Sequence, residues 1–147
     1  MLWCVDRVPA LDTGRGGFHS HILVGRVTRP GIQVLKRDEK TEDTEVRITF
    51  DDTWLYFGFN CRHPEPKAME QTITDHDGII YKDDSVEFIV VPGPAGKKYY
   101  HYMLSFANVQ GERQIEGKMR DTGWNLPWRS ATKKTDFGWT AEAALPL

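Results

Sequence analysis

Cysteine is scarce in this sequence of 147 residues, which contains only Cys4 and Cys61. Two cysteines cannot make a structural zinc site, because such a site needs about four ligands, usually in close pairs. The two thiols can form one disulfide in an oxidising compartment or remain buried and reduced. The sequence leaves both alternatives open.

Long apolar runs and an excess of one charge are also missing. No run approaches the roughly 20 apolar residues that cross a bilayer, and the opening MLWCVDRVPAL lacks the features of a secretory signal. The 19 basic and 21 acidic residues are interspersed and give a formal net charge of -2. Because a phosphate backbone is bound mainly by clustered positive charge, we expect no nucleic acid and no membrane as partners.

Catalytic signatures are absent as well. The sequence has no G-x-S-x-G, no H-E-x-x-H, no glycine-rich phosphate loop and no signature of a nucleophilic cysteine. A pair of carboxylates for glycoside hydrolysis is defined by its separation in space, and no particular pair stands out. We therefore expect a protein that is not an enzyme.

Strand patterns dominate from residue 43 onward. Residues 44–50 and 53–60 alternate apolar and polar side chains, and the pair of aspartates between them predicts a hairpin turn. The second strand should bury Leu55, Phe57 and Phe59. Its other face should carry Trp54, Tyr56, Gly58 and Asn60.

Further short strands follow toward the C-terminus. Residues 85–92 and 97–107 flank the turn PGPAG and predict an antiparallel hairpin, and the segment RQIEGKM predicts a shorter strand. Residues 137–147 alternate again, and we assign one side of that strand to the core, with Phe137, Trp139, Ala141, Ala143 and Leu145.

The fold that these patterns predict is all-β. No stretch shows an apolar stripe of helical period, apart from one short helical turn expected near 67–71, so the helices of a parallel sheet are missing. We predict a single domain over 1–147, an antiparallel β-sandwich. Residues 1–43 are atypical, with two apolar clusters that could be strands and a charged loop at 36–43.

Aromatic side chains, 12% of the sequence, include the first candidates for binding. The loop DTGWNLPWRS (121–130) holds Trp124 and Trp128, which either cap the core or await a flat apolar ligand such as the C–H face of a sugar ring. Trp54 and Tyr56 should form an aromatic platform on the outward face of their strand, unless another segment covers it.

Acidic residues gather in TDHDGIIYKDDSVEF, which supplies Asp75, Asp77, Asp83, Asp84 and Glu87. Calcium takes six to eight oxygen ligands, often from such loops, although the spacing is not that of an EF-hand and turn capping explains the residues equally well. The histidines that we considered as metal ligands are His19, His21, His63 and His76, without a third ligand to complete a site.

The order of four segments resembles a known family. TEVRITFDDTWLYFGFNCRHPEP, DGIIYKDDSVEFIVVP, YYHYMLSFANVQGERQ and FGWTAEAALPL together resemble the carbohydrate-binding module family 9 type domains of the DOMON-like group. The match spans 44–147, and DDSVEF and GWTAEAALP are its most specific parts. The resemblance implies a β-sandwich that binds an oligo- or polysaccharide without catalysis, often beside secreted glycan-degrading enzymes and often with structural calcium, hence an extracellular or periplasmic location.

The resemblance also implies site residues. An aromatic clamp would fall on Trp54 with Trp124 or Trp128, and carboxylates for calcium would be Asp77, Asp83 and Asp84. Polar contacts to sugar hydroxyls would come from Asn108, Gln110, Arg113 and Glu116.

Two departures from the family set further expectations. Residues 1–40 lack the usual acidic-glycine opening before an early tryptophan, for which Trp3 could stand in. Family members continue past ALPL into another strand, so we expect a missing final strand and an exposed sheet edge. Residues 1–35 could cover that edge, a second copy could pair with it as a homodimer, or it could stay open.

Two other functions remain as alternatives. The aromatic residues could anchor a protein partner or a second subunit, which would make this an interaction or oligomerisation domain. A haem could be held as in the cytochrome members of the DOMON group, with candidate ligands Met69, Met103, His76 and His101.

Overall fold

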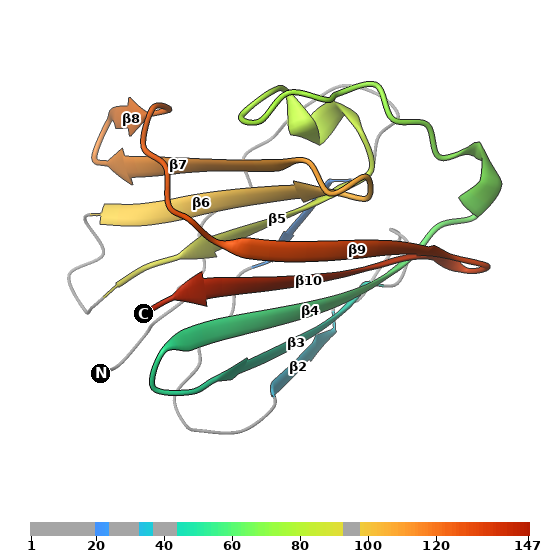
Figure 1. The fold of residues 1–147 in the computed structure, drawn as a ribbon, viewed down its shortest axis with the longest axis horizontal. Coiled ribbons are helices and arrows are strands. Elements are labelled where there is room, and N and C mark those ends of the chain that lie inside the picture. Colours follow the sequence, from blue (N-terminus) through green and yellow to red (C-terminus); the bar gives the residue numbers. More distant parts are fainter. Residues whose placement is uncertain (1–19, 24–32, 37–43, 93–97) are drawn as a thin grey trace.

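The computed structural model describes residues 20–23, 33–36, 44–92 and 98–147, and for the first two ranges only the backbone pairing. Two short 3-10 helices, η1 (Pro66–Ala68) and η2 (Ile80–Lys82), interrupt a fold of strands (Figure 1). The strands are β1 (Ser20–Leu23), β2 (Gln33–Lys36), β3 (Thr44–Phe50), β4 (Trp54–Arg62), β5 (Ser85–Val90), β6 (Lys98–Ser105), β7 (Gln110–Glu116), β8 (Met119–Asp121), β9 (Arg129–Thr135) and β10 (Gly138–Pro146).

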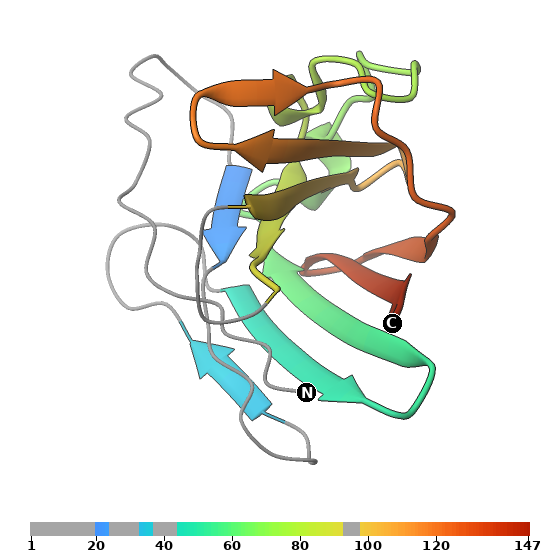
Figure 2. The ribbon, with the colours of Figure 1, turned by 90° about the vertical axis from the view of Figure 1, so that its left-hand side faces the viewer.

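The strands form two layers, which are seen nearly edge-on in Figure 2. One sheet has the order β1-β5-β6-β7-β8 and the other has the order β2-β3-β4-β10-β9. Neighbouring strands are antiparallel except for β1, which lies parallel to β5. The predicted all-β sandwich is confirmed, with this one parallel pair as a difference.

The first hairpin forms where the two aspartates predict it. Thr49 pairs with Tyr56 across β3 and β4, and Asp51 closes the turn. Its Oδ1 accepts the backbone N–H groups of Thr53 and Trp54, each at 2.8 Å. These hydrogen bonds to the charged form, together with one from the Tyr56 hydroxyl, lower the pKa of Asp51 to about 2.

The core lies between the two sheets and is rich in aromatic rings. Phe57 and Phe59 point inward from β4 and meet Phe88 of β5, with ring centroids 4.6 and 5.6 Å apart. Phe88 in turn stacks on Tyr102 of β6 at 5.2 Å. The predicted inward face of β4 is therefore confirmed, as is the assignment of Trp139, which is 2% exposed.

Phe137 is a correction to the predicted core. It is 41% exposed, whereas Ala141, Ala143 and Leu145 are buried as expected. The reason is that β10 begins at Gly138, so Phe137 belongs to the turn after β9 and does not share the alternation of the strand.

The last strand is not at a sheet edge. β10 lies between β4 and β9, while residues 20–23 and 33–36 pair with β5 and β3 at the outer ends of the two sheets. The edge expected at the position of a missing strand is therefore not at β10.

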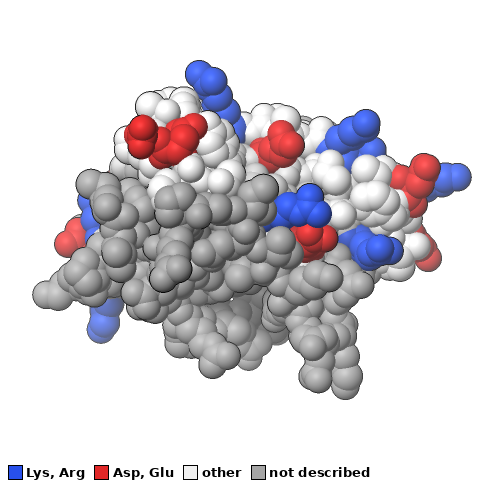
Figure 3. Space-filling view, turned by 90° about the horizontal axis from the view of Figure 1, so that it is seen from below, with Lys and Arg blue, Asp and Glu red and all other residues white. Residues whose placement is uncertain are grey.

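Cys61 is a free, buried thiol, and burial raises its pKa to about 12. Several sequence predictions lie outside the described residues: those on Trp3, Cys4, His19 and the side chain of His21, most of the turn PGPAG (92–96) and most of the loop at 36–43. Within the described ranges, no helix has the length and apolar character to cross a bilayer. On the face shown in Figure 3, the described basic and acidic side chains are interspersed.

Candidate functional site

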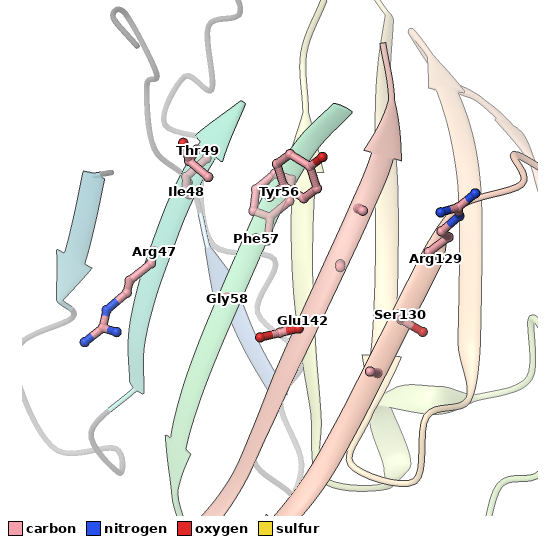
Figure 4. Close-up of a pocket in the computed structure, with 12 residues that line it drawn as sticks. Arg47, Ile48, Thr49, Tyr56, Phe57, Gly58, Arg129, Ser130 and Glu142 are labelled. Atoms are coloured by element: carbon pink, nitrogen blue, oxygen red, sulfur yellow. The ribbon is translucent and has the colours of Figure 1, made fainter. Parts of the chain in front are cut away.

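A groove of about 520 Å³ runs over the outer face of the sheet that contains β3, β4, β10 and β9 (Figure 4). This is the outward face predicted for Trp54 and Tyr56, and no segment among the described residues covers it. The residues that line the groove are Arg47, Ile48, Thr49, Tyr56, Phe57, Gly58, Arg129, Ser130, Ala131, Glu142, Ala143 and Ala144.

Small side chains make this face hollow. Gly58 pairs with Arg47 on one side and with Glu142 on the other, and Glu142 pairs with Ala131. In the next row Ala144 lies beside Tyr56. Since a sheet face is filled by the side chains that stand on it, a row with glycine and alanines beside large residues leaves a depression.

The Tyr56 ring and the Arg129 guanidinium form one end of the groove, and Trp54 lies beside Arg129 without lining the groove. The Tyr56 hydroxyl donates to Asp51 Oδ2 at 2.8 Å, which fixes the direction of the ring. The Arg129 guanidinium lies 4.7 Å from the centre of the Trp54 ring, so a cation covers one face of that indole. Both rings are only half-buried, so they remain accessible to a ligand.

Charged groups lie along the remainder of the groove. Arg47 points away from the groove centre in Figure 4 and bonds to Glu45 through Nε at 2.9 Å. Glu142 is exposed and extends over the floor beside Gly58. The groove thus combines an apolar ring with hydrogen-bond donors and an acceptor at its borders, which suits a ligand with an apolar face and a polar rim.

Trp128 is not on the surface, so the prediction that it awaits a flat apolar ligand is wrong. It is 6% exposed and packs edge-on against Phe88 and Tyr102. Trp124 is half-buried and stacks on Tyr100 with ring centroids 4.6 Å apart. Trp128 therefore caps the core, whereas Trp124 also lines a second pocket together with Tyr100 and Tyr102, so its role in binding stays a prediction.

The four predicted polar contacts do not converge. Asn108 and Gln110 meet at Ser130, whose Oγ donates to Asn108 Oδ1 at 2.7 Å and accepts from Gln110 Nε2 at 2.8 Å. Ser130 lines the groove, so these two side chains support its edge. Arg113 lies on the other face of β7, and Glu116 lies about 20 Å from Gln110 along the same strand.

The three aspartates predicted as calcium ligands do not form one site. Asp83 is 2% exposed and accepts hydrogen bonds from Thr72 and Ile73, so it stabilises the loop before η2. Asp84 lies 3.5 Å from His63. Asp83 and Asp84 are neighbours in an extended chain, so their carboxylates point apart. Asp77 lies apart from both, beside Glu112 of β7.

Asp77 belongs to a different cluster of titratable side chains. Ligand atoms of His76, Asp77 and Glu112 lie within 4.8 Å of one another, and they form the one such group of three found among the described residues. Asn125 joins this cluster, with its Oδ1 3.1 Å from His76 Nε2.

The four candidate haem ligands lie in separate surroundings and do not face a common site. Met69 is buried in the main core and Met103 in a second cluster with Ile80 and Val109. His101 bonds to Glu87 at 2.7 Å, and His76 faces the carboxylates described above. These contacts do not favour haem binding.

Several residues that the structure brings together were not predicted from the sequence. Arg47, Arg129 and Glu142 line the groove because β3 and β10 flank β4 and β9 lies beyond β10, an order that no local pattern reveals. Gly58 carried a signal, since a glycine within a strand interior marks a gap or a close approach. Glu112 looked like an ordinary polar strand residue.

Comparison with known proteins identifies the fold. No protein-family model and no curated protein matches the sequence. A Bacteroides uniformis ATCC 8492 protein whose carbohydrate-binding role is itself inferred has a similar structure, with a TM-score of 0.66, 13% identity, and coverage of 90% of this chain and 74% of its own. A family 9 carbohydrate-binding module from Caldicellulosiruptor kristjanssonii, in complex with cellotriose, is also similar, with a TM-score of 0.54 and 16% identity. That match covers 89% of this chain and 68% of the module's chain. The chain therefore shares the β-sandwich fold of these two proteins.

Proposed function

We propose that this protein binds oligo- or polysaccharides without catalysis, in the groove on the outer face of the sheet β2-β3-β4-β10-β9. The observation that carries the proposal is the open groove of about 520 Å³ with Tyr56 at one end. A pyranose has an apolar C–H face that packs on an aromatic ring, and its hydroxyl rim needs donors and acceptors such as those of Arg129 and Glu142.

The single carboxylate that lines the groove supports binding without catalysis. Of the described residues that line it, Glu142 is the only aspartate or glutamate. Hydrolysis of a glycosidic bond uses two carboxyl groups on either side of that bond in most enzymes. A single carboxylate can accept hydrogen bonds from hydroxyl groups but does not supply that pair.

The similar folds support the choice of ligand class, because one of them belongs to a module bound to cellotriose. The resemblance noted from the sequence points the same way, and with it to an extracellular or periplasmic setting beside glycan-degrading enzymes. A stacked ring contributes about 1 kcal/mol, and each hydrogen bond about as much, so we expect dissociation constants in the micromolar to millimolar range.

Calorimetric titration with soluble glycans, beginning with cello-oligosaccharides, tests the proposal. Tyr56→Ala removes the stacking ring and should weaken binding about five- to tenfold. Gly58→Thr should abolish binding by filling the floor. A Cβ at Gly58 meets Arg47 Cβ only at 3.9 Å, so the strand itself can accept threonine.

Tyr81→Ala is the matched control, because Tyr81 is 44% exposed and does not line the groove. It should bind like the wild type, and thermal unfolding should show that all three variants are folded. The proposal is wrong if no glycan binds, or if Tyr56→Ala and Gly58→Thr both bind as tightly as the wild type.

A further inference from the structure

We propose that His76, Asp77 and Glu112 form a site for a divalent transition-metal ion of the Zn²⁺ type, where the loop 75–78 meets β7. None of these residues lines the groove described above. The site is therefore independent of the proposed sugar binding.

The spacing of the ligand atoms fits such an ion. His76 Nε2 lies 3.3 Å from Glu112 Oε1 and 3.4 Å from Asp77 Oδ2. Zinc bonds of about 2.0–2.1 Å in a tetrahedron place neighbouring ligand atoms about 3.3–3.4 Å apart. The three side chains thus hold two edges of the tetrahedron at the required length.

Each carboxylate uses one oxygen for positioning and turns the other toward the imidazole. Glu112 Oε2 accepts the indole N–H of Trp128 at 2.8 Å, and Asp77 Oδ1 accepts the backbone N–H of Glu112 at 2.9 Å. Glu112 Oε1 and Asp77 Oδ2 are the atoms that face His76. Metal sites depend on such outer hydrogen bonds to orient their ligands.

The loop is fixed on β7 by its backbone. The Asp77 N–H donates to the Gln110 carbonyl at 3.1 Å, and Asp77 has a φ of 59°. Gly111 permits this close packing, because a Cβ there would lie 3.4 Å from Asp77 Cα and 2.7 Å from Ile80 Cδ1. The ligands are therefore positioned before any ion binds.

The charges of the cluster also call for a cation. Glu112 is 1% exposed, and a buried carboxylate is costly unless it is paired. Among the described residues, its ion-pair partner is His76. One N–H on His76 Nε2 can point to only one of three oxygens, namely those of Glu112, Asp77 and Asn125. A metal ion would contact several of them at once.

The mixture of ligands selects the class of ion. One imidazole with two carboxylate oxygens suits zinc or a similar transition metal. Calcium needs six to eight oxygens, more than this cluster offers. The His76 side chain is 48% exposed, so an ion and its remaining water ligands can reach the site from solvent.

The experiment is a calorimetric titration of untagged, chelator-stripped protein at pH 7 with Zn²⁺, Mn²⁺ and Ca²⁺ in turn. The wild type should bind one Zn²⁺ in this site, tighter than Mn²⁺ and without competition from Ca²⁺. His76→Gln and Glu112→Gln should each weaken Zn²⁺ binding at least tenfold. Glu112→Gln keeps the shape of the side chain and an oxygen for Trp128, and circular dichroism in chelator checks that both variants fold.

His101→Gln is the matched control, because His101 pairs with the carboxylate of Glu87 at 2.7 Å and belongs to no group of three metal-ligating side chains within the described part of the chain. It should bind Zn²⁺ like the wild type. The proposal fails if the wild type binds no Zn²⁺. It also fails if His76→Gln and Glu112→Gln bind like the wild type, or if His101→Gln weakens binding equally.

Discussion

Single side chains decide both the turns and the two proposed sites of this protein. Asp51 shows this at the residue scale, because one carboxylate accepts hydrogen bonds from Thr53, Trp54 and Tyr56 and so connects the β3–β4 turn to the end of the groove. Replacing Asp51 should therefore affect folding stability and the orientation of Tyr56 together.

Asp51→Asn should destabilise the protein at neutral pH and matter less in acid. The pKa of Asp51 is about 2 in the folded protein, below the roughly 3.9 of an unfolded aspartate. Its contribution to stability is therefore complete above about pH 4 and is lost as the pH falls through about 2. Urea unfolding followed by tryptophan fluorescence between pH 6 and pH 2 should show the difference between wild type and Asp51→Asn shrinking over that window.

Asp52→Asn provides the control for this measurement, because it removes a charge from the same turn without removing any of these hydrogen bonds. It should cost less stability at pH 6 than Asp51→Asn does. A stability difference between Asp51→Asn and wild type that stays constant from pH 6 to pH 2 would contradict the assignment.

At the scale of elements, the strands were predicted from the sequence more accurately than the segments that connect them. Alternation predicted β3, β4 and β10, and it placed Leu55, Phe57 and Phe59 inward, because the period of two is fixed by backbone geometry. Phe137 was misassigned because the turn before Gly138 shifts the start of the strand. Trp128 could not be placed by periodicity, since it precedes β9 in a segment without one.

The β9–β10 turn depends on a glycine. Gly138 has a φ of 145°, and a Cβ there would lie 2.1 Å from the Cys61 carbonyl oxygen. Gly138→Ala should lower the free energy of unfolding by more than about 3 kcal/mol, because both the backbone conformation and the contact with β4 must change. Thermal or chemical unfolding measures this loss.

Gly117→Ala separates the two causes. Gly117 lies in the β7–β8 turn with a φ of 59°, and a Cβ there would meet no atom within 4 Å. Only the conformational cost remains, so the loss should be about 1–2 kcal/mol. Equal losses at the two positions would show that the close contact at Gly138 is relieved without cost.

At the scale of the whole molecule, the two sheets are held together by one aromatic core. Phe88 is 1% exposed, and its ring lies 4.6 Å from Phe57 across the sandwich and 6.0 Å from Trp128. Phe88→Ala should cost about 3–5 kcal/mol of unfolding free energy, because it leaves a cavity that rings from both sheets cannot close.

Phe137→Ala is the matched control, since it removes the same ring from a position that is 41% exposed. It should change the free energy of unfolding by no more than about 0.5 kcal/mol. Chemical unfolding of both variants tests this pair, and a loss at Phe137→Ala as large as at Phe88→Ala would contradict the boundary of the core. A homodimer through a sheet edge stays a prediction at this scale, to be checked by light scattering.

The two proposed sites differ in how many of their residues could be predicted from the sequence. The aromatic face of β4 was visible as the alternation of Trp54, Tyr56 and Gly58, because side-chain direction along a strand is a local property. Glu112 and Arg129 were not visible, because they join their sites through pairings between distant segments.

The sequence by itself determined the all-β class, the inward and outward faces of its strands and the turn at Asp51, since these depend on backbone periodicity and short-range hydrogen bonds. Only the tertiary structure decided that Trp128 is core, that β9 and β10 complete a groove beside Tyr56, and that His76 faces Asp77 and Glu112. Strand order and register bring together residues far apart in the chain, and the free energy that selects them comes from packing of the whole core.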